Sequence, residues 1–365
     1  MIVLIDYISN NIKQDILNLA KNFGFLEAKI ANLLIKQDTQ TKFCQWINEN
    51  LNGDMYYLAN NMKLRFNPRL LHNNTLSVIC LKIPYLTKDI NYHKNRLLND
   101  EYAYISSYAL GRDYHKVVKN CLKNYAVSIN DYLKKINLTL EYRAFTDSAP
   151  ILEVELAKNA GLGFRGKNTL LLNTKEGSLF FLGELFTNLP LRPDTESLSH
   201  CGSCQKCIEI CPTKAFISPY KLDATKCIAY LTIENKGSIP LEYRKQIGNR
   251  IYGCDDCQLF CPWNKFSKIT TIKDFDIRYN LDQISLIDAF KLSELEWKKI
   301  MQGSPIYRIG YEAWLRNISI ALGNAKYNPL IIKVLQDKLR TSISDMLLEH
   351  IKWAIDEQVS KANVV

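Results

Sequence analysis

The spacing of apolar residues along the first half of the chain predicts a mixture of helices and strands. Apolar residues recur at helical intervals up to Gly24, and residues 1–70 as a whole resemble helical sequence. The apolar, β-branched run at 75–85 predicts a buried strand. Residues 115–136 place their apolar side chains on one face of a long predicted helix. This order of elements is typical of an α/β domain.

The mixture of helices and strands continues beyond this long helix. Residues 151–161 predict a short helix that stops at Gly161. Two strand-like runs follow at 169–173 and 178–185, and the TKEG turn between them predicts a β-hairpin. We therefore expect an α/β domain over residues 1–188.

The second half of the chain divides into a cysteine-rich segment and a helical segment. A polar, proline-bearing linker at 189–200 leads into the cysteines, and after Pro262 the apolar spacing is purely helical. Short helical units at similar spacing are typical of HEAT-like repeats. The sequence thus predicts a small cysteine-rich domain at 189–270 and a helical-repeat domain at 271–365.

Composition adds little to this picture apart from charge. The 365 residues are 47% apolar and 23% charged, as in ordinary globular proteins. No run of 18 apolar residues occurs, and the apolar start is interrupted at Asp6 without a preceding basic segment. We therefore expect no membrane span, no secretory signal and a cytoplasmic protein. The net charge of +10 allows a polyanionic partner such as nucleic acid without requiring one.

Eight of the eleven cysteines are concentrated in one segment and carry the clearest chemical signal. Clustered cysteines in a chain without an expected export signal indicate metal binding rather than disulfides. The first group follows the pattern C-x2-C-x2-C-x3-C-P and the second C-x2-C-x3-C-P, which are typical of loops that hold [4Fe–4S] clusters. The eight residues are Cys201, Cys204, Cys207, Cys211, Cys227, Cys254, Cys257 and Cys261.

The spacing predicts two clusters with crossed ligation. The trailing cysteine of such a motif ligates the other cluster, and Cys227 replaces the cysteine that the second motif lacks. One cluster is then held by Cys201, Cys204, Cys207 and Cys261, and the other by Cys211, Cys227, Cys254 and Cys257. Structural zinc is the alternative, although zinc needs neither three cysteines at three-residue intervals nor two Cys-Pro endings. Two clusters in one module predict transfer of single electrons.

Other motifs give weaker signals. The string GLGFRG at 161–166 has the spacing of a dinucleotide-binding loop but follows a predicted helix, so a nicotinamide or flavin site is not indicated. Asp113-Tyr-His115 is typical of a surface turn, and Asp147, at a strand-to-helix turn, is typical of a helix cap. A cobalamin signature of the form D-x-H-x-x-G is incomplete here, because Val118 occupies the glycine position.

Longer strings identify a family. The chain resembles bacterial epoxyqueuosine reductase over about residues 5–360, with Ser107 at a position where the family commonly has arginine. The matching strings, in chain order, are SSYALGRDYHKVV (106–118), DSAPILE (147–153), AGLGFRGKNTLLLN (160–173), FFLGEL (180–185), CGSCQKCIEICPTKA (201–215), CIAYLTIE (227–234), GNRIYGCDDCQLFCPWN (248–264) and GSPIYRIGYEAWLRNISIALGN (303–324).

The resemblance implies three functional units. They are an N-terminal α/β domain that binds cobalamin, a ferredoxin-like domain with two [4Fe–4S] clusters, and a C-terminal α-helical domain that contacts tRNA. The family binds cobalamin base-off, with no protein histidine on the cobalt, which agrees with Val118. Candidate cofactor contacts by position in the family pattern are Arg65, Tyr108, Gly111, Arg112, Ser148, Lys167, Asn168, Ala229 and Asp255.

The implied reaction removes the epoxide oxygen of epoxyqueuosine at the wobble position of tRNA. It consumes two electrons and two protons and releases water, and an external donor recharges the clusters one electron at a time. Asp147 matches the family's proton donor. Because desolvation beside an apolar corrin face disfavours a carboxylate, we expect a raised pKa for Asp147.

A wobble base can react only if it leaves the anticodon stack. Candidate phosphate contacts are Lys236, Lys298, Lys299, Arg308 and Arg316. We expect a monomer. Two other hypotheses are a reductive dehalogenase-like enzyme acting on a small molecule and a ferredoxin-type electron carrier. The helical tail and the absence of an expected export signal argue against the dehalogenase, and the long region before the clusters argues against the carrier.

Overall fold

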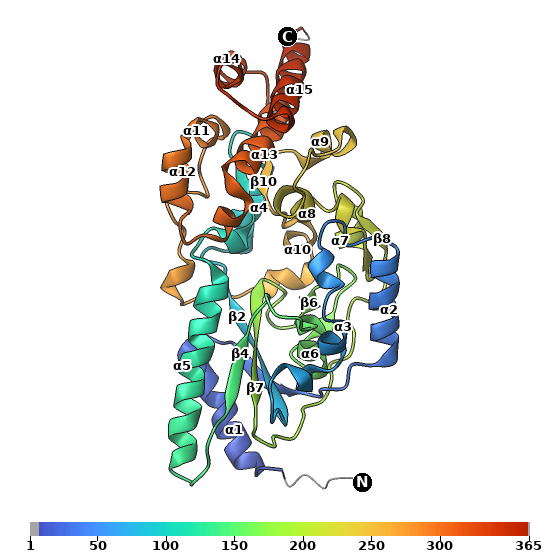
Figure 1. Ribbon diagram of the computed structural model, residues 1–365, viewed down its shortest axis with the longest axis vertical. Coiled ribbons are helices and arrows are strands. Elements are labelled where there is room, and N and C mark those ends of the chain that lie inside the picture. The colour runs from blue at the N-terminus through green and yellow to red at the C-terminus, as the bar shows by residue number, and fades with distance from the viewer. Residues whose placement is uncertain (1–6, 364–365) are drawn as a thin grey trace.

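The computed structural model describes residues 7–363, so the apolar start considered above lies outside the described residues. Figure 1 shows a sheet with its helices at one end of the long axis and the C-terminal helices at the other. The cysteine-rich segment lies between these two ends. None of the described helices has the length together with the apolar composition that crossing a bilayer requires.

A four-stranded antiparallel sheet organises the N-terminal half. Its order is β1 (Glu27–Ala31), β2 (Ser77–Pro84), β7 (Phe180–Thr187) and β4 (Tyr142–Phe145). The strand predicted at 75–85 is confirmed, and β2 is buried along its whole length. The prediction that residues 1–70 are helical is wrong at β1, whose five residues are stabilised by pairing with β2. Such pairing is non-local and leaves little trace in so short a sequence.

Helices cover both faces of this sheet. One face packs against α1 (Asn10–Leu19) and α5 (Tyr114–Lys134), and the other packs against α6 (Glu153–Asn159). Because side chains alternate along a strand, Ile79 of β2 joins the core beside α5, whereas Cys80 joins the core beside α6. The helices predicted at 115–136 and 151–161 are confirmed.

The predicted hairpin at 169–185 is wrong in its pairing. The TKEG turn does close, because Asn173 and Gly177 exchange two backbone hydrogen bonds. The flanking strands then separate. β6 (Leu171–Leu172) pairs with β5 (Phe164–Arg165), while β7 becomes a central strand between β2 and β4. The long apolar run of β7 is explained by burial between two neighbouring strands.

The cysteine-rich segment consists of short elements. In chain order they are α7 (Lys206–Glu209), β8 (Phe216–Ser218), β9 (Lys221–Leu222), α8 (Ile228–Ile233), α9 (Leu241–Ile247), β10 (Arg250–Tyr252) and α10 (Asp256–Leu259). The earlier helices that border this region are α2 (Gln37–Asn48), α3 (Met62–Phe66) and α4 (Ile90–Leu98). β8 and β9 form a small hairpin.

The C-terminal region is helical from Leu286 onward, as predicted, whereas residues 267–285 are mainly loops with two isolated β-bridges. Its α-helices are α11 (Leu286–Lys291), α12 (Glu294–Met301), α13 (Gly310–Asn324), α14 (Pro329–Leu339) and α15 (Asp345–Ala362). A segment of the N-terminal half is built into this region, because β3 (Tyr104–Ile105) pairs in parallel with β10. Residues 103–110 accordingly share one hydrophobic core with α11, α13 and α15. The three domain ranges and the repeat character of the helices stay predictions.

Candidate active site and cluster-binding loops

The cysteines lie on two loop–helix units that contact each other. Cys204 and Cys207 lie at the start of α7, and Cys254 and Cys257 lie at the start of α10. These two short helices are in contact. The C-x2-C spacing therefore places thiols from both motifs around one region, as a pair of neighbouring clusters requires.

The thiols that influence one another electrostatically can be compared with the two predicted ligand sets, which stay a prediction. Burial raises the pKa of the Cys207 thiol to about 11, and the thiols that add to this effect are Cys261, Cys201 and Cys204. Burial also raises the pKa of Cys257, where the neighbouring thiols are Cys227, Cys211 and, more weakly, Cys207. These neighbour relations agree with the ligand sets, with Cys207 bordering both.

The arrangement of the thiols does not match a single zinc ion. A tetrahedral zinc site needs four ligands about 2.0–2.3 Å from one point. Among residues 7–363, no three His, Cys, Asp or Glu side chains are grouped closely enough to hold one ion. A cluster of four irons is wider than one ion and is held by thiols that lie farther apart.

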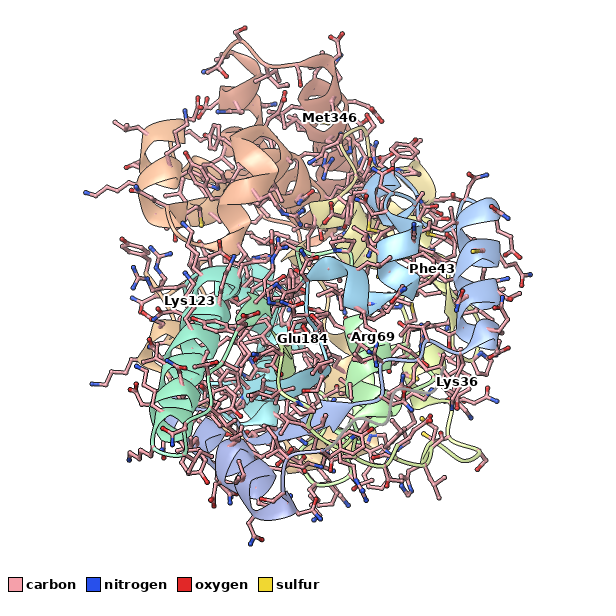
Figure 2. The ribbon with its side chains drawn as sticks, turned by 60° about the horizontal axis from the view of Figure 1, so that its bottom comes forward. Lys36, Phe43, Arg69, Lys123, Glu184 and Met346 are labelled. Carbon is pink, nitrogen blue, oxygen red and sulfur yellow. The ribbon has the colours of Figure 1, made fainter. Side chains whose placement is uncertain are left out.

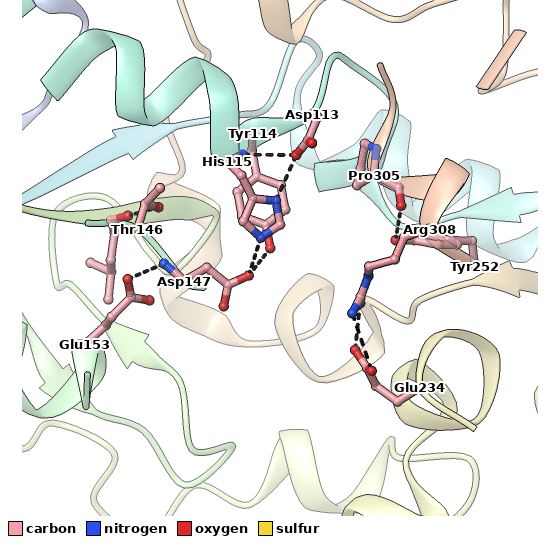
Figure 3. A network of polar contacts seen from close by, with 11 residues as sticks. Asp113, Tyr114, His115, Thr146, Asp147, Glu153, Glu234, Tyr252, Pro305 and Arg308 are labelled. Atoms are coloured by element: carbon pink, nitrogen blue, oxygen red, sulfur yellow. Dashed lines mark hydrogen bonds and ion pairs between the residues drawn. The ribbon is translucent and has the colours of Figure 1, made fainter. Parts of the chain in front are cut away.

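Asp147 lies on the loop between β4 and α6, in a left-handed backbone conformation with φ of 56°. Non-glycine residues are uncommon in this region of φ and ψ, although aspartate adopts it more readily than most. Tyr114 donates a hydrogen bond to Asp147 Oδ2, and the Nε2 atom of His115 lies 2.9 Å from the same oxygen (Figure 3). The carboxylate is half exposed, so it faces open space on its other side.

The first turn of α5 supplies both partners of Asp147. Asp113 accepts from the backbone amide of His115 and caps the helix, and its Oδ1 also lies 2.8 Å from His115 Nδ1. His115 is therefore held at both ring nitrogens by carboxylates. The interpretation of Asp113-Tyr-His115 as a plain surface turn is wrong, because tertiary packing against β4 brings these residues to Asp147. Asp147 is also not the cap of α6, which begins after Leu152.

The charges in this group differ from the expectation. Partial burial alone would raise the pKa of Asp147, but hydrogen bonds from His115 and Tyr114 outweigh it and lower the pKa. Burial opposes protonation of His115, yet its bonds to Asp113 and Asp147 raise its pKa to about 9. The raised pKa was predicted for Asp147 beside a bound corrin and stays a prediction, whereas in the protein alone the pKa is lowered. At neutral pH the exchangeable proton lies on His115, beside an ionised Asp147.

Two glutamates lie behind the Asp147 loop. Glu153 accepts a hydrogen bond from the backbone amide of Asp147. Glu184, in the middle of β7 and labelled in Figure 2, is 0% exposed. Burial and the charges of nearby carboxylates raise the pKa values of both glutamates. The carboxyls that resist ionisation are therefore these two, not Asp147.

An ion pair lies across from Asp147. Arg308 donates to both oxygens of Glu234, the shorter bond being 2.6 Å, and Figure 3 shows this pair facing the Asp147 group. The charge of Arg308 lowers the pKa of Asp147. Burial and the negative charges of Glu234 and Asp147 raise the pKa of Tyr57, and Arg308 opposes this increase. The Asp147 loop, Tyr57 and the Arg308–Glu234 pair therefore face one another without direct contact, and each part contributes an exposed side chain.

Three predicted cofactor contacts, Lys167, Asn168 and Asp255, make hydrogen bonds to the protein in or beside the cluster loops. Lys167 Nζ donates to the carbonyls of Gly202 and Cys204 at 2.7 and 2.9 Å. Asn168 donates to the carbonyl of Cys257 at 3.3 Å. Asp255 is fully buried, and Tyr104, Ser106 and Ser107 donate to its two oxygens. This contradicts a side-chain contact between Asp255 and a cofactor.

The other predicted cofactor contacts have different surroundings. Arg65 is buried and donates to the carbonyls of Tyr57 and Asn60. Tyr108 belongs to an aromatic group with Tyr114, Phe181 and Tyr252. Gly111 packs against the backbone of Phe275, and a Cβ there would come within 2.7 Å. Arg112 pairs with Asp274 on the surface, Ser148 is exposed beside Asp147, and Ala229 is half-buried in α8.

The predicted tRNA contacts differ in exposure. Arg308, Lys236, Lys298 and Lys299 are exposed. Lys298 pairs with Glu294 at 2.6 Å. Arg316 is 0% exposed and donates to the carbonyls of Leu231, Asn235 and Gly237. The prediction that Arg316 contacts tRNA is wrong, because its donors stabilise the backbone around α8.

A basic row beside Asp147 was not predicted. Lys116, Lys119 and Lys123 of α5 line a hollow of about 400 Å³ together with His115 and Ser148. Helical spacing from Lys116 onward could have revealed the row, since residues three and four apart share a helix face. Glu153 and Glu184 could have been noticed as acids within the strings DSAPILE and FFLGEL.

Comparison with known proteins defines the class. Residues 200–264 match the family of the 4Fe-4S double cluster binding domain. Together with the proton-holding group at Asp147, this makes the chain an iron–sulfur oxidoreductase with two [4Fe–4S] clusters. Residues 65–148 match the family described as epoxyqueuosine reductase QueG, DUF1730.

Full-length relatives define the family. An epoxyqueuosine reductase from Pseudomonas aeruginosa is 44% identical over 343 residues, which cover 94% of this chain and 93% of the relative. The epoxyqueuosine reductase of Escherichia coli K12 is 43% identical over 354 residues, covering 97% and 91%. The chain therefore belongs to the epoxyqueuosine reductase family.

Solved structures agree with this fold. Epoxyqueuosine reductase from Streptococcus thermophilus superposes with a TM-score of 0.84 at 28% identity, covering 96% of this chain and 91% of that one. An epoxyqueuosine reductase solved with a tRNA-Tyr epoxyqueuosine-modified stem loop gives a TM-score of 0.79 at 23% identity, covering 96% and 99%. A Bacillus subtilis member solved with its catalytic loop swung out of the active site gives 0.78 at 22% identity, covering 95% and 99%.

Proposed function

We propose that this chain reduces epoxyqueuosine to queuosine at the wobble position of tRNA, with Asp147 and His115 delivering protons to the epoxide oxygen. The reaction breaks both C–O bonds of the epoxide, consumes two electrons and two protons, and releases water. The observation that carries the proposal is the Asp113–His115–Asp147 group, which holds a proton at an exposed site in a chain with two clusters.

The pair of His115 and Asp147 is suited to this proton transfer. In the protein alone, His115 is protonated and Asp147 is ionised. When substrate covers the site and excludes water, two separate charges become less favourable than a neutral pair. The proton then moves from His115 Nε2 to Asp147, which can donate it to the leaving oxygen. Tyr114 holds the same carboxylate oxygen and fixes the direction of donation.

The residues around Asp147 fit a large, flat cofactor such as cobalamin. Asp147 and the Tyr57 ring are both half exposed, and the Arg308–Glu234 pair faces them. Both ring nitrogens of His115 are engaged by carboxylates, so this histidine is not free to bind cobalt, which agrees with a base-off cofactor. Bound cobalamin would supply reduced cobalt as the electron donor to carbon.

Contacts to the corrin are proposed for residues that border this space. Ser148 is exposed beside Asp147, and Tyr108 packs against Tyr114. Arg65 holds the carbonyl of Tyr57 and so positions its loop. Lys167 and Asn168 donate to backbone carbonyls of the cluster loops and so hold these loops in place.

The tRNA contact is proposed for the exposed basic residues. Arg308 lies at the site itself, and Lys236, Lys298 and Lys299 lie on the helical side. The row of Lys116, Lys119 and Lys123 lies on the α5 side of Asp147. Phosphates bind such residues with a steep dependence on salt. A flipped wobble base would then enter the site between the lysine row of α5 and the basic residues of the helical region.

Single-turnover conversion tests the proposed function. The protein is reconstituted anaerobically with iron, sulfide and cobalamin, reduced chemically, and mixed with an epoxyqueuosine-bearing anticodon stem loop. We expect nucleoside mass spectrometry to show loss of one oxygen, and no loss when cobalamin is omitted. A fully loaded and reduced protein that leaves the epoxide intact would overturn the proposal.

A further inference from the structure

We propose that Glu153 and Glu184 form a proton-sharing carboxyl pair that holds the Asp147 loop in its reactive position. The inference rests on the function proposed above, because it concerns the geometry of the same acid. Both glutamates act through Asp147 rather than on the reacting atoms, so they are positioning residues.

Glu153 is the anchor of the loop. The backbone amide of Asp147 donates to the Glu153 carboxyl across six residues of chain. Asp147 has a φ of 56°, a conformation that is held only where surrounding contacts fix it. Without this hydrogen bond, the turn loses the side-chain contact that joins it to α6.

Glu184 explains why the anchor can hold a proton. It lies opposite Cys80 and Phe145 in the sheet, and its side chain points to the face that α6 covers. Neither of its carboxyl oxygens has a conventional donor among residues 7–363. A buried carboxylate without a donor is strongly disfavoured. The Glu184 carboxyl lies within hydrogen-bonding reach of the Glu153 carboxyl. A proton shared between them satisfies both groups, because a protonated Glu184 donates while Glu153 still accepts from Asp147.

The surroundings of the pair set its response to pH. The other titratable groups that face it are Asp147 on the loop, Cys80 on β2, and Tyr114 and His115 on α5. Among these, His115 is the group that carries positive charge. Loss of the shared proton would set two adjacent buried carboxylates against each other. Glu153 would then withdraw, and the Asp147 loop would lose its anchor as pH rises.

The variant Glu184→Gln tests this response directly. Its amide can donate to Glu153 as the shared proton does, but it cannot ionise in this pH range. We expect single-turnover conversion to stay within about 3-fold of wild type at low pH, and the decline on the alkaline side to flatten. Hydrogen exchange of the peptide that spans residues 146–152, corrected for intrinsic rates, should lose protection with rising pH in wild type but not in E184Q.

A second variant tests the anchor itself. Glu153→Ala should expose the Asp147 amide to exchange at every pH and lower single-turnover conversion by about 10²-fold, the usual cost of misplacing a catalytic group. Glu155→Gln is the matched control, because Glu155 lies on the same helix but contacts Thr39 and Lys158. We expect this control to behave like wild type in both assays.

The outcomes separate this inference from the proposed function. An E184Q variant with the wild-type pH dependence of exchange, or an E153A variant whose Asp147 amide stays protected, would overturn the carboxyl pair. Wild-type protein that shows pH-dependent protection but no conversion of the epoxide would overturn the function and leave the pair intact.

Discussion

Asp147 and Asp255 both accept hydrogen bonds from a tyrosine and lie near a histidine, but Asp147 is half exposed and Asp255 is fully buried. Asp147 is half exposed and contacts a tyrosine and a histidine of α5. Asp255, between two cluster cysteines, is 0% exposed and accepts from Tyr104, Ser106 and Ser107. The first carboxylate keeps a side open to a reactant, whereas the second has every oxygen occupied by the protein.

The two nearby histidines show the same contrast. His93 lies near Asp255 and contacts Ser107 Oγ at 2.9 Å, but burial and the positive charge of Arg96 lower its pKa to about 4. His115 is flanked by two carboxylates, which overcome burial and raise its pKa to about 9. Asp255 and His93 therefore form a buried structural group, whereas Asp147 and His115 hold an exchangeable proton. The difference follows from burial and from the charge of the third residue, Arg96 in one group and Asp113 in the other.

The largest expected effect is at Asp147. Asp147→Asn keeps the shape and the hydrogen bond from Tyr114 but removes the carboxylate that carries the proton. We expect single-turnover conversion to fall by about 10²- to 10⁴-fold, the usual contribution of a general acid. Cluster and corrinoid absorbance should be unchanged.

The control for this variant is Asp131→Asn, at an exposed residue of α5 that pairs with Lys134. It should convert the stem loop at the wild-type rate. Near-wild-type conversion by the Asp147→Asn variant would show that the two aspartates do not differ in the way described, and would transfer the role of acid to His115.

The next effect concerns Asp255. Asp255→Ala leaves three buried donors without an acceptor, so we expect a loss of roughly 3 kcal/mol in the free energy of unfolding and a lower iron content. Thermal unfolding and iron analysis measure both. Protein that does load both clusters should convert epoxide at the wild-type rate. A specific loss of turnover at full iron content would contradict a purely structural role.

The sequence predicted the local features of the site and missed the non-local ones. The double-cluster domain could be predicted because each cysteine motif lies within one loop, and α5 and α6 follow from apolar spacing within each helix. The contact of His115 with Asp147 joins residues on α5 and after β4, and the approach of Glu184 to Glu153 depends on the register of β7. The lowered pKa of Asp147 in the protein alone could not be predicted for the same reason, since it is set by those contacts.

The two histidines should respond to pH with opposite sign. The raised pKa of His115 means that its contribution to the free energy of unfolding is complete below about pH 6.5 and is lost as pH rises through about 9. The lowered pKa of His93 means that its contribution is present above about pH 6.5 and is lost as pH falls towards about 4.

Urea unfolding of wild type, His115→Gln and His93→Gln across this pH range measures both contributions. The difference between wild type and the His115→Gln variant should shrink on the alkaline side, and that for His93→Gln should change on the acid side. Parallel curves for all three proteins would remove the contrast between the histidines.

The smallest effect is expected at the basic row that borders Asp147 and has no counterpart at Asp255. Lys119→Glu should weaken binding of the stem loop several-fold and lower the slope of log affinity against log salt by about 0.7–0.9 for each lost phosphate contact. The control is Lys352→Glu, which makes the same charge change at an exposed position of α15. Equal salt slopes for both variants would place the RNA elsewhere.

Because β3 pairs with β10, which is synthesised much later, β3 cannot pair while the first half of the chain emerges from the ribosome. Tyr104 leaves the exit tunnel long before its partner Arg250 leaves it. At roughly 5–20 residues per second, the interval is roughly 7–30 s. During this time residues 103–110, most of which are apolar and buried in the folded protein, have neither strand partner nor core. Synthesis of this enzyme therefore passes through a nascent chain with an exposed strand edge, the kind of segment that chaperones bind.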